Sequence, residues 1–478
     1  MINTTPLIEK LSNAALVILG LGTEGLSTYT FLRKHLPTQH ILLIDEKPVA
    51  KLSSEWKEIQ ESDKQVSFST QITEHLTSQL SERQLLVFKT PGISVHNPII
   101  QAAQKLNAEF SSNSNLFFSL VQLAQNQGLN IKTIGVTGTK GKSTTTSAIH
   151  HILSNSGITA YIGGNIGTPP LSIWEQILES AENNVTQNSV FAVLELSSHQ
   201  LSDLKFSPNY AVVLNITPEH LDYYKDFNEY MHAKAQICRY QTETDTTIFN
   251  SQQDLPTKIA YLSPAKKLTF SQEENIVENW ISYKSEKIID LDSLAVIGQH
   301  TVLNLIPGSI LAKEIGLSTQ SIATALRSFK PLPHRLEIVG QFNQVSYYND
   351  SLSTTPIATI AALKSFANEP IILIAGGYDR GLDYSDLAQA ILDRQVKHVI
   401  LLPDTGEIIL EEMQKRLVHN MGEIQFTETD SLESAVHIAK TISQPGDIVL
   451  LSPASASFNM FKSYQERGDL FRNLVSKK

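Results

Sequence analysis

Short apolar runs alternate with helical stretches along the N-terminal part of the chain. Residues 16–19, 41–44 and 85–88 consist entirely of Leu, Ile, Val and Phe, which is typical of strands buried on both faces. Because neighbouring parallel strands need a helical crossover between them, this alternation predicts a parallel sheet flanked by helices.

The same alternation recurs in the rest of the chain. Strand-like runs follow at residues 131–134, 190–196, 211–216, 246–250, 371–375, 399–402 and 448–451. The polar stretch at residues 111–115 and the pair Pro331 and Pro333 interrupt the pattern and mark two boundaries. Residues 252–287 are polar, and we expect an irregular, peripheral part of the middle domain there.

Length and composition support a multidomain enzyme. At 478 residues the chain has room for about three domains. Its 41% hydrophobic and 18% charged residues fit a globular protein rather than a disordered one. We therefore expect an α/β fold with three domains, at residues 1–113, 114–330 and 331–478.

The charge and the cysteine content of the chain limit its cellular location and its partners. The single cysteine, Cys238, excludes an internal disulfide framework and a thiolate metal cluster, and it suits a reducing cytoplasm. A net charge of −10 argues against nucleic acid as a partner. The apolar run at residues 14–22 is too short to span a bilayer, and the N-terminus lacks a secretory signal pattern. We expect a cytoplasmic protein without membrane insertion.

The stretch Gly135-Val136-Thr137-Gly138-Thr139-Lys140-Gly141-Lys142-Ser143-Thr144 lies between a strand-like run and a predicted helix at residues 144–153. A glycine-rich turn in this position presents backbone N–H groups to phosphate oxygens at the positive end of a helix. Lys142 can reach the terminal phosphates, and the Ser143 hydroxyl can bind Mg²⁺. Val136 stands where the usual pattern has glycine, and Gly138 supplies the flexibility instead. We predict a nucleotide phosphate loop of a particular subtype.

A second glycine turn, Gly20-Leu21-Gly22-Thr23-Glu24-Gly25, separates the first two predicted strands, and Asp45 follows Gly25 by twenty residues. In dinucleotide-binding sheets the glycines of such a turn hold a pyrophosphate and the acidic residue binds ribose. The turn favours an NAD-dependent dehydrogenase or, more generally, the pyrophosphate of any nucleotide resting on a helix N-terminus.

Ionisable side chains follow the predicted strands of the middle segment. Glu195 closes one of them, and the carboxyl ends of parallel strands face the ligand crevice, so this carboxylate is a natural Mg²⁺ ligand. His220 follows the next strand and is either a metal or phosphate ligand or a structural histidine. Lys234 lies on a predicted helix, where a lysine taken by itself is a solvated residue.

The last segment carries further candidate binding residues, namely Arg335, Arg380 and Ser457. Arg335 follows the proline-stiffened linker and either reaches phosphate across a cleft or stays on the surface. Loops beginning near Asp350, Gly376 and Ser452 each follow a predicted strand, so we expect them to share one rim. There Arg380 would pair with a carboxylate, and Ser457 would hydrogen-bond another.

The motifs of these segments occur in one order along nearly the whole chain. They are Gly-x-Thr-Gly-Thr-x-Gly-Lys-Ser, Glu-Leu-Ser-Ser, Asn-x-Thr-x-x-His-x-Asp, Tyr-x-x-Ala-Lys, Gly-x-His, Leu-Pro-His-Arg, Asn-Asp-Ser and Ser-Pro-Ala-x-Ala-Ser. Together they resemble the Mur ligases of peptidoglycan synthesis, and within that family the members that add glutamate.

The resemblance implies a Rossmann-like N-terminal domain for UDP, a central P-loop ATPase domain and a Rossmann-like C-terminal domain for the amino acid. It implies an ADP-forming ligase that uses ATP and Mg²⁺ to add glutamate to UDP-N-acetylmuramoyl-L-alanine through an acyl phosphate. It also implies a cytoplasmic monomer.

Roles for individual residues follow from the resemblance. The UDP substrate would contact Gly20, Gly22, Gly25, Asp45, Thr90, Gly92 and Asn165. ATP would contact Gly138, Thr139, Gly141, Lys142, Ser143, Thr144, Asn304, Arg335 and Asp350. Glutamate would contact Arg380, Ser457, Phe458 and Tyr464. Mg²⁺ would be held by Ser143, Glu195, His220 and a carbamylated Lys234, and the catalytic set would be Lys142, Glu195, His220 and Lys234.

Two positions depart from the family pattern. Leu352 stands where the common D-glutamate-adding members have the lysine of Asp-Ser-Lys-Ala-Thr, and Thr301 replaces a frequent asparagine. A missing cation beside the reacting groups indicates a differently arranged pocket, and Ser-Thr-Thr-Pro and Gly-Thr-Glu-Gly resemble a branch that adds L-glutamate. We expect D-glutamate, with L-glutamate as the alternative. An NAD-dependent dehydrogenase, a folate-type polyglutamate ligase and an inactive nucleotide-binding scaffold are the other classes of protein left open.

Overall fold

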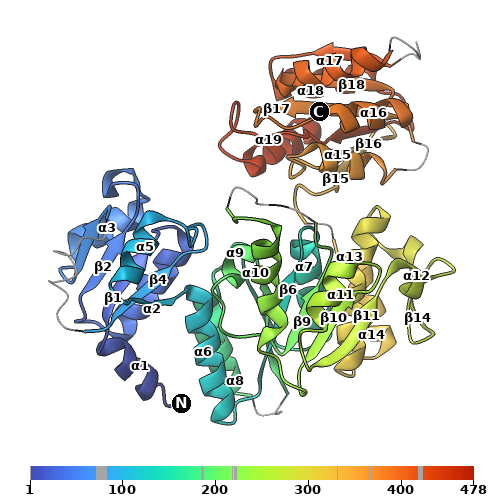
Figure 1. Cartoon of the computed structure of the whole chain (residues 1–478). Helices are drawn as coiled ribbons and strands as arrows, with labels where there is room; N and C mark the ends of the chain where they lie inside the picture. The colour runs from blue at the N-terminus through green and yellow to red at the C-terminus, as the bar shows by residue number, and fades with distance from the viewer. Residues whose placement is uncertain are drawn as a thin grey trace. The chain divides into compact units, whose positions relative to one another are not determined.

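The computed structural model, drawn in Figure 1, divides into two compact units. One comprises Met1–Asp292 and Leu303–Arg327, and the other comprises Ser293–Val302 and Ser328–Lys478. Both are built on sheets of mostly parallel strands covered by helices, which confirms the α/β fold class. The division into three domains stays a prediction. The structure describes residues 2–71, 83–184, 188–217, 219, 223–330, 332–366, 369–417 and 424–477.

The first unit begins with a five-stranded parallel sheet in the order β3-β2-β1-β4-β5. The predicted strands at residues 16–19, 41–44 and 85–88 are confirmed. Strand order reverses at β1, which lies between β2 and β4, and such a reversal opens a crevice at the carboxyl ends of the strands. The elements are β1 (Ala15–Leu19), β2 (Ile41–Ile44), β3 (Val66–Ser69), β4 (Leu85–Lys89), β5 (Glu109–Ser111), α1 (Thr5–Ser12), α2 (Thr23–His35), α3 (Ser54–Ser62) and α5 (Pro98–Lys105).

A second, six-stranded parallel sheet of the same unit has the order β11-β10-β9-β6-β8-β7. Its central strand β6 precedes the phosphate loop and lies between β8 and β9. The strands are β6 (Ile131–Thr137), β7 (Ala160–Gly164), β8 (Val190–Glu195), β9 (Tyr210–Val213), β10 (Thr246–Asn250) and β11 (Lys266–Phe270). The helices are α6 (Asn113–Asn126), α7 (Lys142–Asn155), α8 (Trp174–Glu182), α9 (Ser198–Leu201), α10 (Phe227–Arg239), α11 (Asp254–Ala260), α13 (Gln299–Glu314) and α14 (Thr319–Ser328).

The expectation of irregular structure at residues 252–287 was wrong. The segment contains α11 and β11 and continues into a small antiparallel sheet of β12 (Ile276–Val277), β13 (Trp280–Tyr283) and β14 (Glu286–Asp290). Its two-residue turns place Glu278 and Asn279, and then Lys284 and Ser285, at positive φ. Such turns normally carry Asn-Gly or Asp-Gly, so the sequence lacked the usual hairpin signal.

The polar stretch at residues 111–115 is not a solvent-exposed linker. Ser112, Asn113, Ser114 and Asn115 are all buried, and the Ser112 side chain caps α6. Asn113 Nδ2 donates to the Glu24 carbonyl at 3.3 Å, and its Oδ1 accepts from the Leu171 amide at 3.1 Å. These side chains tie the two sheets of the first unit together by hydrogen bonds.

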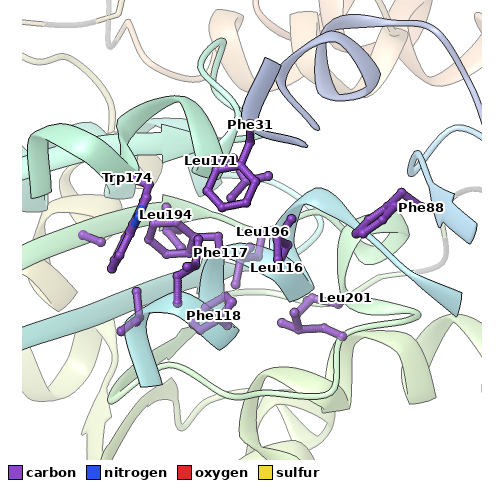
Figure 2. Close-up of a cluster of buried hydrophobic side chains, with 14 of the residues drawn as sticks. Phe31, Phe88, Leu116, Phe117, Phe118, Leu171, Trp174, Leu194, Leu196 and Leu201 are labelled. Atoms are coloured by element: carbon purple, nitrogen blue, oxygen red, sulfur yellow. The ribbon is translucent and has the colours of Figure 1, made fainter. Parts of the chain in front are cut away.

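Apolar packing continues through the same region. One buried cluster includes Phe31 and Phe88 from the five-stranded sheet and its cover, Phe117 from α6, and Trp174 and Leu194 from the six-stranded sheet and its cover. Figure 2 shows these side chains in one close-up. The two sheets of the first unit therefore share one hydrophobic core.

The second unit carries a six-stranded sheet in the order β15-β16-β20-β17-β18-β19, parallel except for the β15–β16 hairpin. The strands predicted at residues 371–375, 399–402 and 448–451 are confirmed. Helices cover both faces of this sheet, and a separate apolar cluster lies under the helices on each face. The elements are β15 (Glu337–Phe342), β16 (Val345–Asn349), β17 (Ile371–Gly377), β18 (His398–Asp404), β19 (Gln425–Glu428), β20 (Ile448–Leu451), α15 (Pro356–Leu363), α16 (Ser385–Asp393), α17 (Thr405–Leu417), α18 (Leu432–Ile442) and α19 (Tyr464–Ser476).

Within the described ranges, no helix is long and apolar enough to cross a membrane.

Glu314 at the end of α13 is expected to stabilise the first unit in a pH-dependent way. Burial alone would raise its pKa, but hydrogen bonds from Lys266, Lys284 and Tyr283 outweigh burial and lower the pKa to about 2. The stabilisation is present above the unfolded pKa of 4.5 and is lost as the pH falls toward 2. Glu314→Gln should therefore lower the thermal midpoint at pH 7, by the equivalent of roughly 1–2 kcal/mol.

Differential scanning fluorimetry from pH 7 to pH 3 tests this expectation. The difference between wild type and Glu314→Gln should narrow below pH 4.5, whereas Glu273→Gln, at an exposed position of α12 (Gln272–Asn275), should match wild type throughout. A difference that stays constant down to pH 3 would exclude the charge as its cause.

Candidate functional site

The phosphate loop joins β6 to α7 through two glycines in unusual conformations. Gly138 has φ 154°, and a Cβ there would lie 2.7 Å from the Leu214 Cβ. Gly141 has φ 88° and caps α7, which begins at Lys142. Val136 is fully buried inside β6, so the turn begins after it. This geometry explains why the sequence needs glycine at 138 and tolerates valine at 136.

The loop is tied to the segment that follows β9. The Thr139 amide donates to the Asn215 carbonyl at 2.7 Å, and Thr139 Oγ1 lies 2.9 Å from the Tyr230 hydroxyl. On its other side the loop meets α13, because a Cβ at Gly141 would lie 2.2 Å from Asn304 Oδ1. The structure thus brings Asn304 to the phosphate loop, as expected for a nucleotide-binding residue.

Two lysine amines converge on one carbonyl oxygen of the loop. Lys142 Nζ donates to the Gly138 carbonyl at 3.1 Å and to the Thr139 carbonyl at 2.9 Å. Lys234 Nζ, from α10, donates to the same Gly138 carbonyl at 2.9 Å. Lys234 is only 1% exposed, and burial together with the charge of Lys142 holds the pKa of its amine well below the ordinary value. The reading of Lys234 as a solvated residue was therefore wrong.

Glu195 at the end of β8 is a buried carboxylate. Its Oε1 accepts a hydrogen bond from Asn165 Nδ2 at 2.9 Å, whereas its buried Oε2 has no hydrogen-bond partner among the described residues. A buried carboxylate oxygen of this kind suits a cation. Ser143 is the second residue of α7, the helix that follows β6, and β6 pairs with the strand β8 that ends at Glu195. The described residues alone form no group of three His, Cys, Asp or Glu side chains able to hold a metal. The predicted ligand His220 lies outside them.

Most of the predicted UDP-binding residues meet at the switch point of the five-stranded sheet. Gly20 follows β1 with φ 93°, and a Cβ there would lie 1.9 Å from Thr90 Oγ1, just past β4. Asp45 follows β2, and its Oδ2 accepts from the Leu21 amide at 2.8 Å. Gly22 caps α2, and Gly25 lies in its first turn. Gly92 lies in the turn after Thr90. The remaining predicted UDP-binding residue, Asn165, does not lie at this switch point but beside Glu195 in the six-stranded sheet.

In the second unit, the three loops expected at one rim are indeed neighbours. The Tyr378 amide donates to the Ala456 carbonyl at 2.9 Å, and Arg380 Nη2 donates to the Thr354 carbonyl at 2.8 Å. The rings of Tyr378 and Phe458 lie 6.2 Å apart, and Phe458 is 64% exposed. The loop after β16 thus lies against the loops after β17 and β20.

Asp350, Ser457 and Tyr464 occupy buried or anchored positions near the same loops. Burial raises the pKa of Asp350 to about 6, although hydrogen bonds and the charge of Arg335 oppose this shift. Ser457 is buried, and the Tyr464 carbonyl accepts from Ser351 Oγ at 2.8 Å. All three residues belong to the second unit, and their roles stay predictions.

Two residues that help to build these sites were missed from the sequence. Tyr230 bonds to Thr139, and its ring lies 4.8 Å from Lys234 Nζ. Arg467 is buried in the second unit and donates to the carbonyls of Ser351 and Ser455. Tyr230 belongs to the Tyr-x-x-Ala-Lys motif, so the sequence held a signal for it that was not used. A buried arginine on a helix, such as Arg467, has no local sequence signal.

The fold and the loop between β6 and α7 define an α/β protein that binds nucleotide phosphate. The chain matches the Mur ligase middle domain over residues 136–312 and the Mur ligase glutamate ligase domain over residues 334–455. A UDP-N-acetylmuramoylalanine–D-glutamate ligase of Clostridium tetani is 33% identical, over 97% of this chain and 96% of that protein. The chain belongs to the Mur ligase family, whose members use ATP.

Solved structures show the same fold at lower sequence identity. The MurF ligase of Thermotoga maritima in complex with ADP has a TM-score of 0.55 at 16% identity, over 98% of this chain and 99% of that one. The UDP-N-acetylmuramate-alanine ligase MurC of Thermotoga maritima has a TM-score of 0.54 at 18% identity, over 97% and 99%.

The N-terminal glycine turn allows a matched pair of substitutions. A Cβ at Gly25 would lie 2.2 Å from the Gly20 carbonyl oxygen, whereas a Cβ at Gly22 would meet nothing within 4 Å. Gly25→Ala should lower the stability of the first unit by roughly 1–3 kcal/mol because backbone must move. Gly22→Ala should stay near wild type in a thermal melt without ligand. Equal melting of the two variants would contradict the close packing of this turn.

Proposed function

We propose that the protein joins glutamate to UDP-N-acetylmuramoyl-L-alanine, with cleavage of ATP to ADP and phosphate. The observation that carries this proposal is the 33% identity, over nearly the full length of both chains, with a ligase named for this reaction. The alanine carboxylate would take the γ-phosphoryl group of ATP, and the glutamate amine would then displace phosphate from the acyl phosphate. Membership of the Mur ligase family argues against an NAD-dependent dehydrogenase. In this proposal the glycine turn would bind the diphosphate of UDP instead of that of NAD.

The phosphate loop and its neighbours would provide the electrostatic part of the reaction. Lys142 would neutralise charge on the transferring phosphoryl group, and the N-terminus of α7 would bind phosphate oxygens. Ser143, Glu195 and His220 would hold Mg²⁺, which neutralises phosphate charge when bound. Oε2 of Glu195, which has no hydrogen-bond partner among the described residues, supports the metal assignment.

Lys234 would act as a carbamate rather than as an ammonium ion. Carbamylation requires an uncharged amine, and the burial that lowers the pKa of Lys234 favours that form. The neutral amine adds carbon dioxide and loses a proton, which leaves an anionic carbamate that can bind Mg²⁺. In place of two like charges at the Gly138 carbonyl, the carbamate would face the Lys142 ammonium group with the opposite charge.

Substrate binding would be divided among the glycine turn, the phosphate loop and the second unit. The turn between β1 and α2 would bind the UDP diphosphate, with Asp45, Thr90 and Gly92 toward the uridine and Asn165 toward the sugar. Arg380, Ser457, Phe458 and Tyr464 would receive glutamate, while Arg335 and Asp350 would contact ATP. We further propose a cytoplasmic monomer, a setting that suits the free, buried Cys238.

The proposed reaction has two versions, which differ in whether the added amino acid is D-glutamate or L-glutamate. The names of the curated relatives favour D-glutamate, whereas Leu352 at the place of a pocket lysine favours L-glutamate. We propose D-glutamate as the substrate, with the L isomer as the second candidate. Purified protein given UDP-N-acetylmuramoyl-L-alanine, ATP and each isomer separately should release phosphate with D-glutamate at least tenfold faster. Turnover with L-glutamate alone would reverse the assignment and make Leu352 the first residue to examine.

Removal of the Lys234 amine tests the carbamate. Lys234→Ala should abolish phosphate release, and added acetate or propionate should restore part of it, because a small carboxylate can occupy the place of the carbamate. Lys258→Ala on α11 is the matched control and should keep full activity. If short carboxylates rescue nothing in a Lys234→Ala protein that melts like wild type, the carbamate assignment fails.

A further inference from the structure

The Glu24 carboxyl group connects the N-terminal glycine turn with the loop that follows Glu195. Glu24 is the second residue of α2, within the Gly20–Gly25 turn. Its Oε1 accepts a hydrogen bond from Gln200 Nε2 at 2.7 Å. The Gln200 side chain is itself fixed, because its Oε1 accepts from the Ser197 amide at 3.0 Å as part of the capping box of α9. A chain of hydrogen bonds thus runs from the glycine turn to a point two residues past Glu195.

The surroundings of this carboxyl group compensate poorly for a negative charge. Oε2 is buried without a hydrogen-bond partner in the part of the chain that the structure describes. The cation that acts on it is Lys89 at the end of β4, and Lys89 Nζ is already paired with Asp203 Oδ2 at 2.9 Å. Burial raises the pKa of Glu24 to about 7, against the opposing effects of the Gln200 hydrogen bond and the Lys89 charge.

The place of Glu24 on α2 brings this carboxyl group close to the diphosphate of the proposed substrate. The backbone N–H groups of a first helical turn are the donors that bind phosphate, and Glu24 carries one of them. A diphosphate bound by these N–H groups would lie against the first turn of α2, the turn that also carries the Glu24 side chain. Two negative charges so close disfavour the ionised carboxylate.

We propose that Glu24 is a positioning residue for the UDP-linked substrate, whose binding is accompanied by proton uptake at this carboxyl group. Protonation of Oε2 leaves Oε1 as an acceptor, so the hydrogen bond from Gln200 persists and the loop after Glu195 stays in register with the occupied turn. The inference rests on the proposed function, because it takes the diphosphate to bind at Gly20–Gly25.

Glu24→Gln reproduces the neutral form of the group. The amide oxygen can accept from Gln200, and the amide nitrogen takes the place of the protonated oxygen. The variant should therefore bind the substrate without proton uptake and with an affinity that does not change with pH. Wild type should bind more weakly as the pH rises from 6.5 to 8.5, up to about tenfold for each unit by which binding raises the Glu24 pKa.

Calorimetric titration with UDP-N-acetylmuramoyl-L-alanine measures the proton count directly. The heat of binding is compared in two buffers of different ionisation enthalpy at pH 7.5, with nucleotide and glutamate left out. This substrate suits the test because its diphosphate is esterified at both ends and has no group that titrates near pH 7. Wild type and Glu58→Gln, changed at an exposed position of α3, should both take up about half a proton or more, and Glu24→Gln close to none.

The outcomes separate this inference from the function on which it rests. Zero uptake by wild type, or the same uptake in Glu24→Gln, overturns the role of Glu24 while the ligase assignment stands. A protein that binds no UDP-N-acetylmuramoyl-L-alanine at any pH overturns the proposed function itself. A purely structural role would lower the melting temperature of Glu24→Gln without changing the proton count. Zero uptake by wild type overturns the inference even if the variant does not fold.

Discussion

One backbone oxygen, the carbonyl of Gly138, sets the chemistry of the first unit. It accepts hydrogen bonds from both Lys142 and Lys234, in a turn where a side chain at 138 would strike Leu214. Two amines bound to one oxygen repel each other when both are charged, and burial penalises the charge further. Lys234, the more buried of the two, therefore carries the lowered pKa. The loop thus favours the uncharged form of the Lys234 amine, which is the form that reacts with carbon dioxide.

Parallel strands explain why these groups meet, although they are far apart in sequence. β6 and β8 pair in register, so the phosphate loop and Glu195 emerge at the same edge of the six-stranded sheet. β1 and β4 do the same in the five-stranded sheet, which brings Gly20 against Thr90. In each sheet the glycine turn lies beside the central strand, where the crevice at the carboxyl edge opens.

The sequence allowed prediction of those features that depend on local patterns. Apolar runs predicted the buried strands. Glycine patterns predicted the two turns at Gly20 and Gly138, where the structure has backbone angles that few other residues adopt. The pairing of Glu24 with Gln200 joins residues 176 positions apart and has no local signature. The turn at Lys284 and Ser285 was missed for the opposite reason, since its residues contradict the usual preference and tertiary packing overrides it.

Buried polar side chains between the two sheets of the first unit give their contact a specific geometry. An apolar surface such as that around Phe117 and Trp174 stabilises association but tolerates sliding, because hydrophobic attraction has no direction. Hydrogen bonds from Asn113 to Glu24 and Thr28 of α2 hold only at one relative position of the two sheets, and the ion pair between Lys89 and Asp203 would be broken at any other. Glu24 is bonded to Asn113 through its carbonyl and to Gln200 through its carboxyl group, so a change in its charge acts on a part of the core where directional bonds fix how the two sheets meet.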